Sequence, residues 1–293
     1  MRVPDKLMFQ SAFEAQQKQA ARFETASRVA SSGLKVEKPS DGAPAWTASV
    51  RLKSTAAATK QRRAIASQAS GDLEVADAAL AAAADRLVRA RELALQMSNG
   101  TLGAADRLDA AREIDAIRDD LVSLANTRGQ RGYLFGGTAT GTPPFSATGV
   151  FGGNNNPFNI PLAEGVTANV APSGAQAFTA ALGGRDIFAD LANLSTALST
   201  NNVPNVIASL DQLSAGHRQL TGVRTDTGLA LNRLQSAIEV GKNAEDRLAS
   251  SRAGLIEAET ISAIGELTSA QTAFERGVDV TKRVLSLTSL NRG

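Results

Sequence analysis

The sequence predicts a mainly α-helical protein: an elongated helical rod with paired N- and C-terminal coiled-coil helices and a small β-rich insert. Two of the observations behind this prediction come from the chain ends. Apolar residues recur at both ends at alternating intervals of three and four residues, which is the spacing of a coiled-coil seam. The third observation is a central segment, residues 132–184, where helical periodicity stops and Gly, Pro and Asn interrupt the chain every few residues.

The first predicted helix covers roughly residues 6–31. Its seam is the series Phe9, Phe13, Gln16, Ala20, Phe23, Ser27 and Ala30. A stripe this narrow must be buried against another helix. We expect the helix to stop at Gly33, because glycine readily takes the left-handed conformation that follows a helix end.

Two further helices are predicted before the central segment. Residues 36–42 have the pattern of a turn, with Ser40 or Asp41 as the expected N-cap of a helix over residues 44–97. At 1.5 Å per residue that helix would be roughly 75 Å long, longer than a compact domain of this size would use. A third helix is predicted over residues 104–127. Its seam is the series Ala110, Ile114, Ile117, Leu121 and Leu124.

The central segment differs in composition from the helices around it. Residues 132–184 contain one charged residue, Glu164, together with 11 of the 25 glycines and 5 of the 9 prolines. Half of the aromatic residues also lie here, and disordered segments lack aromatics, so we expect a small folded insert rather than a disordered loop. The predicted β-strands cover residues 159–162 and 166–170.

Helical periodicity returns after residue 184. We predict a short helix over residues 186–199, a break at 201–204, a long helix to about residue 251 and a final helix to about residue 287. The seam of the final helix is the series Ile264, Leu267, Gln271, Phe274, Val278, Thr281 and Leu285. Because this spacing matches that of the first helix, the two ends are predicted to pair with each other or with other copies.

These elements divide the chain into five predicted segments. They are the N-terminal coiled-coil helix (1–40), the N-terminal part of the rod (41–131), the β-rich outward insert (132–184), the C-terminal part of the rod (185–254) and the C-terminal coiled-coil helix (255–293). The partner-binding residues predicted on the terminal seams are Phe9, Phe13, Phe23, Ile264, Leu267, Phe274, Val278 and Leu285. A protein whose two ends are built to pair is more typical of an assembly subunit than of a free enzyme.

The sequence offers no set of residues for catalysis, for a cofactor or for a metal ion. It has no cysteine and a single histidine, His217, whereas zinc sites use several ligands of these types. No Gly-rich phosphate loop occurs. We therefore predict that the protein is not an enzyme and binds no cofactor. We also expect no membrane insertion and no cleaved signal peptide, because no apolar run approaches ~20 residues and the N-terminus has no apolar region.

The charge distribution leaves one alternative open. Residues 1–63 contain 12 Lys and Arg against 5 Asp and Glu, so the chain begins with a basic helix. Such a helix is compatible with a cytoplasmic coiled-coil adaptor or a nucleic-acid-binding protein. We favour no nucleic-acid partner, because the basic residues are spread along the helix without the interleaved aromatics that stack on bases.

Several short motifs resemble the bacterial flagellin family. Residues 31–36 (SSGLKV) and 39–42 (PSDG) resemble its N-terminal stretch. Residues 267–273 (LTSAQTA) and 286–290 (SLTSL) resemble its C-terminal helix and usual ending. At the start of the insert, residues 132–138 (GYLFGGT) resemble the branch of the family that joins the flagellar hook to the filament.

This resemblance implies a structural component of the bacterial flagellum, an adaptor at the hook–filament junction that is assembled through its terminal helices. It implies self-association into a ring layer, with a hook-associated protein below, flagellin above and an export chaperone as a further partner. It also implies an extracellular location in the flagellum, reached by type III export without a cleaved signal peptide. The alternative within the family is flagellin, the filament subunit itself.

Overall fold

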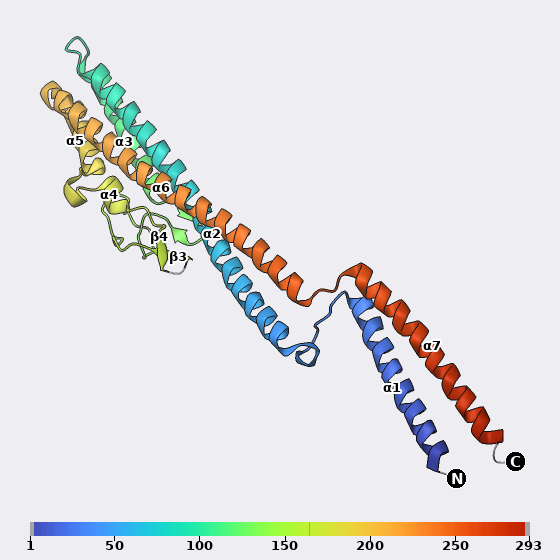
Figure 1. Cartoon of the computed structure of the whole chain (residues 1–293). Coiled ribbons are helices and arrows are strands. Elements are labelled where there is room, and N and C mark those ends of the chain that lie inside the picture. Colours follow the sequence, from blue (N-terminus) through green and yellow to red (C-terminus); the bar gives the residue numbers. More distant parts are fainter. Residues whose placement is uncertain (1–2, 164, 291–293) are drawn as a thin grey trace. The chain divides into compact units, whose positions relative to one another are not determined.

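The structure is a computed structural model that describes residues 3–163 and 165–290. Its elements, in chain order, are α1 (Val3–Ser32), η1 (Pro39–Asp41), α2 (Ala43–Met97), α3 (Ala104–Ala125), β1 (Arg128–Gly129), β2 (Gly132–Tyr133), β3 (Asn159–Ala163), β4 (Val166–Asn169), α4 (Gly174–Phe178), η2 (Ala181–Gly183), α5 (Ile187–Ser199), α6 (Val203–Ile256) and α7 (Thr260–Leu290). The predicted mainly α fold class with a small β-rich insert is confirmed, since the strands all lie between α3 and α5 (Figure 1).

The chain divides into two compact units, which we describe separately. The terminal unit contains residues 1–57 and 245–293, and the central unit contains residues 58–244. The long helices α2 and α6 contribute to both units. The terminal unit includes both predicted coiled-coil segments together with the adjoining ends of these two helices.

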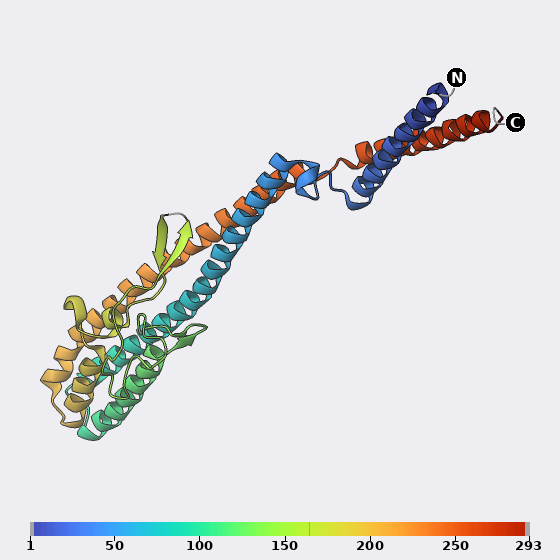
Figure 2. The ribbon, with the colours of Figure 1, turned by 90° about the horizontal axis from the view of Figure 1, so that it is seen from below.

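The central unit is a helical bundle of α2 from residue 58, α3, α5, and α6 up to residue 244 (Figures 1 and 2). The seam predicted on α3 lies inside it. Its buried residues include Ala110, Ile114, Ile117 and Leu121. Opposite them, α5 buries Leu191, Leu194 and Leu198. Each fully buried leucine or isoleucine contributes about 1.5–3 kcal/mol, so this bundle has a substantial apolar core.

One buried charge holds two turns of the bundle. The Arg107 side chain donates from Nε to the Met97 carbonyl (3.0 Å) and from Nη2 to the Asn99 carbonyl (2.8 Å), where α2 ends. Its Nη1 donates to Oδ1 of Asn201, in the turn between α5 and α6. A cation is favoured beside the carbonyls of a helix C-terminus, so these carbonyls stabilise the buried Arg107 guanidinium.

Phenylalanine side chains join the insert to the bundle. The ring centroid of Phe145 lies 5.5 Å from those of both Phe178 and Phe188, a distance typical of paired aromatic rings. Gly149 approaches the same cluster with φ +84°, and a Cβ at this position would lie 2.4 Å from Cγ of Phe188. Both the backbone conformation and the space therefore require glycine here.

A buried carboxylate anchors the hairpin of the insert. Oδ1 of Asp72, on α2, accepts the N–H of Gln130 (2.7 Å), and Oδ2 accepts Nε of Arg131 (2.6 Å). The Arg131 guanidinium lies 4.7 Å from the ring centroid of Phe158 and donates to the carbonyl of Val170. Phe158 and Val170 flank the β3–β4 hairpin. Asp72 therefore links both ends of this hairpin to α2 through Arg131.

The two strands predicted in the insert are confirmed as β3 and β4. They pair antiparallel, with Asn159 opposite Asn169. The β1–β2 pair and α4 are not predicted by the sequence pattern. Strands of two residues and a helix of five are too short to show a hydrophobic period.

In the terminal unit, α1 and α7 lie side by side and run antiparallel (Figures 1 and 2). The pairing sets Arg22 opposite Glu266 and Phe23 opposite Phe274. The stop predicted for the first helix is confirmed, because α1 ends at Ser32 and Gly33 has φ +72°.

Candidate assembly interface

Small side chains form the contact between α1 and α7. Ala26 is buried on α1, and Ala263 and Ala270 are buried on α7. A Cβ added to Gly277 would lie 3.9 Å from Cγ of Gln19, so these two residues also face each other. Small residues let two helices approach closely, but they remove little apolar area from water. The pair is therefore held by a modest hydrophobic contribution.

One aromatic pair crosses this contact. The ring centroids of Phe23 and Phe274 lie 5.8 Å apart and the rings are inclined by 13°. Both side chains are half-buried, and such a stack contributes about 0.5–1.5 kcal/mol beyond the burial of its area. Nη2 of Arg22 lies 2.7 Å from Oε1 of Glu266, but this exposed ion pair adds only about 0–1 kcal/mol.

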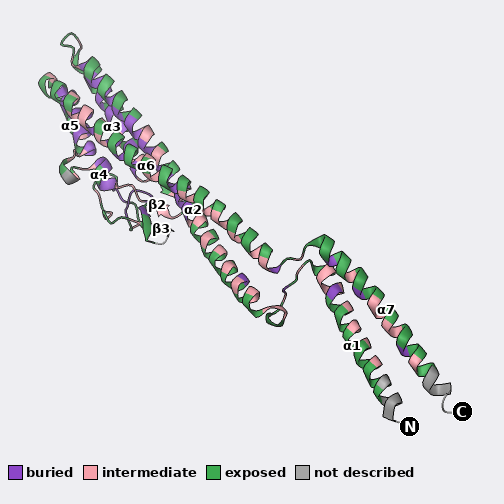
Figure 3. Ribbon diagram, in the orientation of Figure 1, coloured by how far each residue is buried: buried purple, intermediate pink, exposed green. Residues whose placement is uncertain are grey.

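The eight predicted seam residues fall into three groups according to their contacts and exposure. It brings Phe23 and Phe274 into contact across the helix pair. It leaves Leu267 and Val278 half-buried. The remaining four are exposed to 37% (Phe9), 47% (Phe13), 55% (Ile264) and 49% (Leu285). Exposed positions recur along both α1 and α7 (Figure 3). Their role in binding a partner stays a prediction.

The least exposed stripe of α7 has the predicted period but differs at alternate positions. It consists of Ala263, Leu267, Ala270, Phe274, Gly277 and Thr281. Ala263 and Ala270 thus take the inner positions that the sequence assigns to Ile264 and Gln271. A two-helix pair buries one stripe on each helix, so larger apolar residues beside it stay in solvent. We refer to Phe9, Phe13, Ile264 and Leu285 as the outer stripe.

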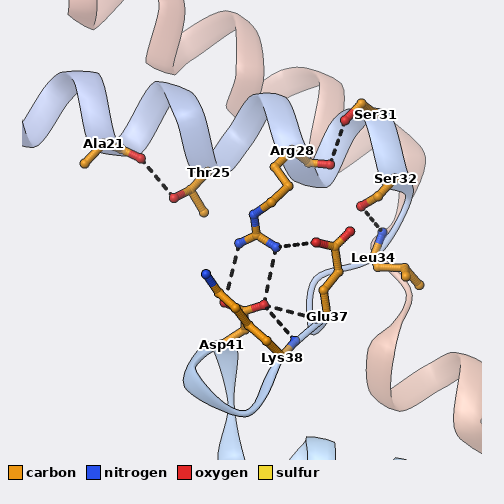
Figure 4. A network of polar contacts seen from close by, with 9 residues as sticks. All are labelled: Ala21, Thr25, Arg28, Ser31, Ser32, Leu34, Glu37, Lys38 and Asp41. Atoms are coloured by element: carbon orange, nitrogen blue, oxygen red, sulfur yellow. Dashed lines mark hydrogen bonds and ion pairs between the residues drawn. The ribbon is translucent and has the colours of Figure 1, made fainter.

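A polar network closes the segment between α1 and α2 (Figure 4). Nη1 of Arg28 lies 2.9 Å from Oε2 of Glu37 and 3.3 Å from Oδ2 of Asp41. The same Asp41 oxygen accepts the N–H groups of Glu37 (3.1 Å) and Lys38 (3.2 Å). Asp41 therefore stabilises the turn η1 and links it to the end of α1. We call Arg28, Glu37 and Asp41 the clasp.

The prediction that Ser40 or Asp41 caps α2 is wrong. Helix α2 begins at Ala43, and the Trp46 N–H donates to the carbonyl of Gly42 (2.9 Å), so Gly42 has the N-cap position. The Asp41 carboxylate cannot cap α2 because it is already bonded to Arg28 and to the turn before it.

The contacts of the clasp shift the pKa of all three groups toward the charged form. Hydrogen bonds with Ser32 and then Arg28 lower the pKa of Glu37. The N–H groups of Glu37 and Lys38, together with the charge of Arg28, lower the pKa of Asp41. The hydrogen bond to Glu37 in turn raises the pKa of Arg28. The clasp is therefore fully charged at neutral pH.

Backbone hydrogen bonds also join the two connecting segments of the terminal unit. The Lys35 N–H donates to the Ile256 carbonyl (2.7 Å), and the Ala258 N–H donates to the Gly33 carbonyl (2.8 Å). Nζ of Lys35 adds a bond to the carbonyl of Gly254 (2.9 Å). The chain leaving α1 is thus paired with the chain entering α7.

The arrangement provides helix surfaces for packing. Within residues 3–163 and 165–290, no three His, Asp or Glu side chains are placed to hold a metal ion. Across the same residues, no helix has both the length and the apolar character needed to cross a membrane. The single histidine, His217, is half-buried on α6.

Sequence reasoning missed the clasp and the Asp72–Arg131 anchor. The only local signal for the clasp is the Pro39–Gly42 turn, where an aspartate often bonds to nearby backbone N–H groups. No local signal exists for Asp72 and Arg131, because 59 residues separate them.

Comparisons with known proteins support the resemblance to the bacterial flagellin family. Residues 5–140 match the bacterial flagellin N-terminal helical region. The chain is 25% identical over 266 residues to flagellar hook-associated protein 3 of Salmonella typhimurium, which covers 83% of this chain and 84% of that protein. It is 31% identical over 147 residues to flagellar hook-associated protein 3 of Escherichia coli, which covers 50% of this chain and 46% of that protein. The predicted resemblance is confirmed.

The fold is also found in solved structures. A structure from Vibrio parahaemolyticus, assigned to the flagellar hook-associated proteins, superimposes with a TM-score of 0.68 at 20% identity. The match covers 74% of this chain and 100% of that chain. At this identity the likeness shows a shared fold.

Proposed function

We propose that this chain, which carries the bacterial flagellin N-terminal helical region over residues 5–140, is a structural component of the flagellum that assembles at the hook–filament junction. The observation that carries the proposal is the match to hook-associated protein 3 over 83% of this chain and 84% of that protein. The family is structural rather than catalytic, and the α1–α7 pair suggests how such a subunit would assemble.

The exposed apolar side chains of the outer stripe favour binding of the terminal helices to neighbouring subunits. The fully buried apolar residues of the contact between α1 and α7 are alanines, whereas the large side chains of the outer stripe remain in solvent. Full burial of one such side chain contributes about 1.5–3 kcal/mol. Docking the outer stripe against adjacent subunits would therefore stabilise a helix pair that has a small core of its own. Assembly and ordering of the termini are coupled in this mechanism.

The proposal includes the partners that the family resemblance implies. The chain self-associates into a ring layer, with a hook-associated protein below it and flagellin above it. It is exported to the extracellular flagellum, and a chaperone binds it before export. The chain has no cysteine, so it keeps one covalent state in reducing and oxidising compartments alike.

The substitution Phe13→Asp tests the role of the outer stripe. Phe13 makes its ring contact with Phe9 on the same helix, so a charge there should not disturb the residues that α1 and α7 bury against each other, but it should prevent burial of this side chain against a neighbour. Ala15→Asp is the matched control, because Ala15 is exposed and lies about 200° around the helix from Phe13. The readouts are filament formation and swimming in a strain that lacks its own copy, and circular dichroism of the purified chains.

We expect Phe13→Asp to abolish filament formation, with Ala15→Asp and the parent chain behaving alike and all three showing the same helix content. Normal filaments with Phe13→Asp would contradict assembly through the outer stripe. Polymerisation of the purified chain alone into long filaments would instead identify it as a flagellin rather than a junction protein.

A further inference from the structure

The central unit has a groove of about 640 Å³ beside the β3–β4 hairpin. We call the small residues of its lining, Ala66 on α2 and Ala237 and Gly241 on α6, its floor. The Arg63 side chain lies 3.6 Å from a Cβ built on Gly241. The groove follows α6 from Leu229 to Ala244, a distance of about 22 Å at 1.5 Å per residue. A floor of small residues allows another helix to approach closely, because ridges of side chains fit into such grooves.

The groove is basic and partly apolar. Its lining includes Arg62, Arg63 and Arg233, and no carboxylate occurs among its described lining residues. Val240, also in the lining, is 68% exposed, so this apolar side chain is open to an occupant of the groove. A complementary occupant must therefore present apolar side chains with carboxylates beside them.

A surface with that composition lies further along α2 in the same unit. Asp85, Val88, Glu92 and Leu95 follow at intervals of three, four and three, so they share one face of the helix. All four are exposed, and Val88 and Leu95 are 42% and 58% exposed. Glu74 continues this face three turns earlier and is also exposed. We call these five residues the acidic stripe.

We propose that the acidic stripe of one copy docks in the basic groove of a second copy of this chain. Val88 and Leu95 would lie on the small-residue floor, beside the exposed Val240. Asp85 and Glu92 would face the arginines at the rim, Arg62 and Arg233, and Glu92 would exchange its exposed 3.7 Å pair with Arg89 for this contact. This inference rests on the proposed function, because it names a second contact between the subunits of one layer.

The contact is head-to-tail, because the groove and the acidic stripe are different surfaces of the same unit. Each copy binds one neighbour through its groove and another through its stripe. Contacts of this kind propagate from copy to copy, and they close into a ring when the rotation between neighbours permits. The central unit would thereby contribute to a layer that the terminal helices also hold.

Disulfide cross-linking of the full-length chain tests the contact directly, since the natural sequence has no cysteine. One chain carries Val240→Cys in the groove and a second, with a tag of different mass, carries Val88→Cys in the acidic stripe. The two are mixed and oxidised mildly. The matched control replaces the second chain with one carrying Ser123→Cys, which is exposed on α3 away from the stripe.

We expect the Val240–Val88 mixture to give at least fivefold more mixed dimer than the Val240–Ser123 mixture. Arg62→Glu with Arg233→Glu in the groove chain should lower this yield to that of the control. Asp85→Lys with Glu92→Lys in the partner chain should restore it. The yield should also fall as salt is raised from 0.1 to 1 M, because the Debye length shortens from about 10 to 3 Å.

Equal yields in the two mixtures would overturn the proposal. A dominant Val240–Val240 dimer would do so as well, because it would indicate a two-fold rather than a head-to-tail contact. Repeating the experiment with Phe13→Asp in both chains separates this inference from the proposed function. With Phe13→Asp in both chains, loss of filament formation with the cross-link retained supports both. In chains that keep Phe13, normal filaments without the cross-link reject the groove contact alone.

Discussion

The terminal and central units are both built from long helices, but they differ in what the helices bury. The largest fully buried side chains, among them Phe178, Leu121 and Leu194, all lie in the central unit of the described chain. The α1–α7 pair fully buries alanines, only half-buries Phe23 and Phe274, and leaves the outer stripe in solvent. Because apolar burial is the main stabilising contribution, the central unit is expected to fold alone and the terminal pair to depend on neighbours.

The largest effect is expected from a cavity in the central unit. Leu194→Ala removes a fully buried side chain between α5 and α3, and should lower the free energy of unfolding by about 4 kcal/mol. Urea denaturation followed by circular dichroism measures it. Leu267→Ala in the half-buried seam of α7 is the matched control and should hardly move the main transition. Equal losses of unfolding free energy from Leu194→Ala and Leu267→Ala would contradict the expected difference in stability between the two units.

A smaller effect is expected from the anchor of the insert. Asp72→Ala leaves the Gln130 N–H and the Arg131 guanidinium without their acceptor, and should cost about 2–3 kcal/mol because Arg131 can still reach solvent. The same denaturation measures it. Asp72→Asn keeps one acceptor oxygen and should lose less. If Asp72→Ala and Asp72→Asn both leave the free energy of unfolding almost unchanged, the anchor does not stabilise the central unit.

The smallest effect concerns the clasp of the terminal unit and its dependence on pH. Glu37 and Asp41 have pKa values lowered in the folded chain, so the stability they contribute is present above their unfolded pKa and is lost as the pH falls through the folded values. The amide signals of Glu37 and Lys38 should therefore stay constant near neutrality and move only in acid. NMR spectra recorded down the acid range follow this change.

The variant Arg28→Ala gives the clasp prediction a sharper form. Without the guanidinium, the pKa values of Glu37 and Asp41 should rise toward their ordinary range, so the amide signals should begin to move at higher pH. Arg22→Ala removes the exposed pair with Glu266 instead. It should leave unchanged the midpoint pH at which the amide signals of Glu37 and Lys38 move. An unchanged midpoint in Arg28→Ala would show that the backbone hydrogen bonds alone hold the turn.

The sequence predicts the period of each helix better than the face that its partner covers. Regular spacing locates α1, α3 and α7, and Gly33 marks a helix end because its left-handed conformation is a local property. The choice between Ala263 and Ile264 as an inner position depends on how closely two helices approach. Spacing cannot decide this, because both residues belong to adjacent stripes with the same period.

Polar contacts were the least predictable part of both units. The PSDG turn is recognisable, but only the folded chain shows that Asp41 bonds to Arg28 rather than capping α2. The same limit applies to Asp72 and Arg131, whose pairing depends on how the insert returns to the helices. Local composition predicts where a polar side chain lies along the chain, and tertiary packing decides which group it meets.

Arg107 has a further consequence for the motions of the bundle. Its one guanidinium donates to carbonyls at the end of α2 and to Asn201 in the turn between α5 and α6. Fraying of either turn breaks bonds to the same side chain that also holds the other turn. This end of the bundle is therefore expected to open and close as one cooperative event, with both turns exchanging their amide protons at a common rate.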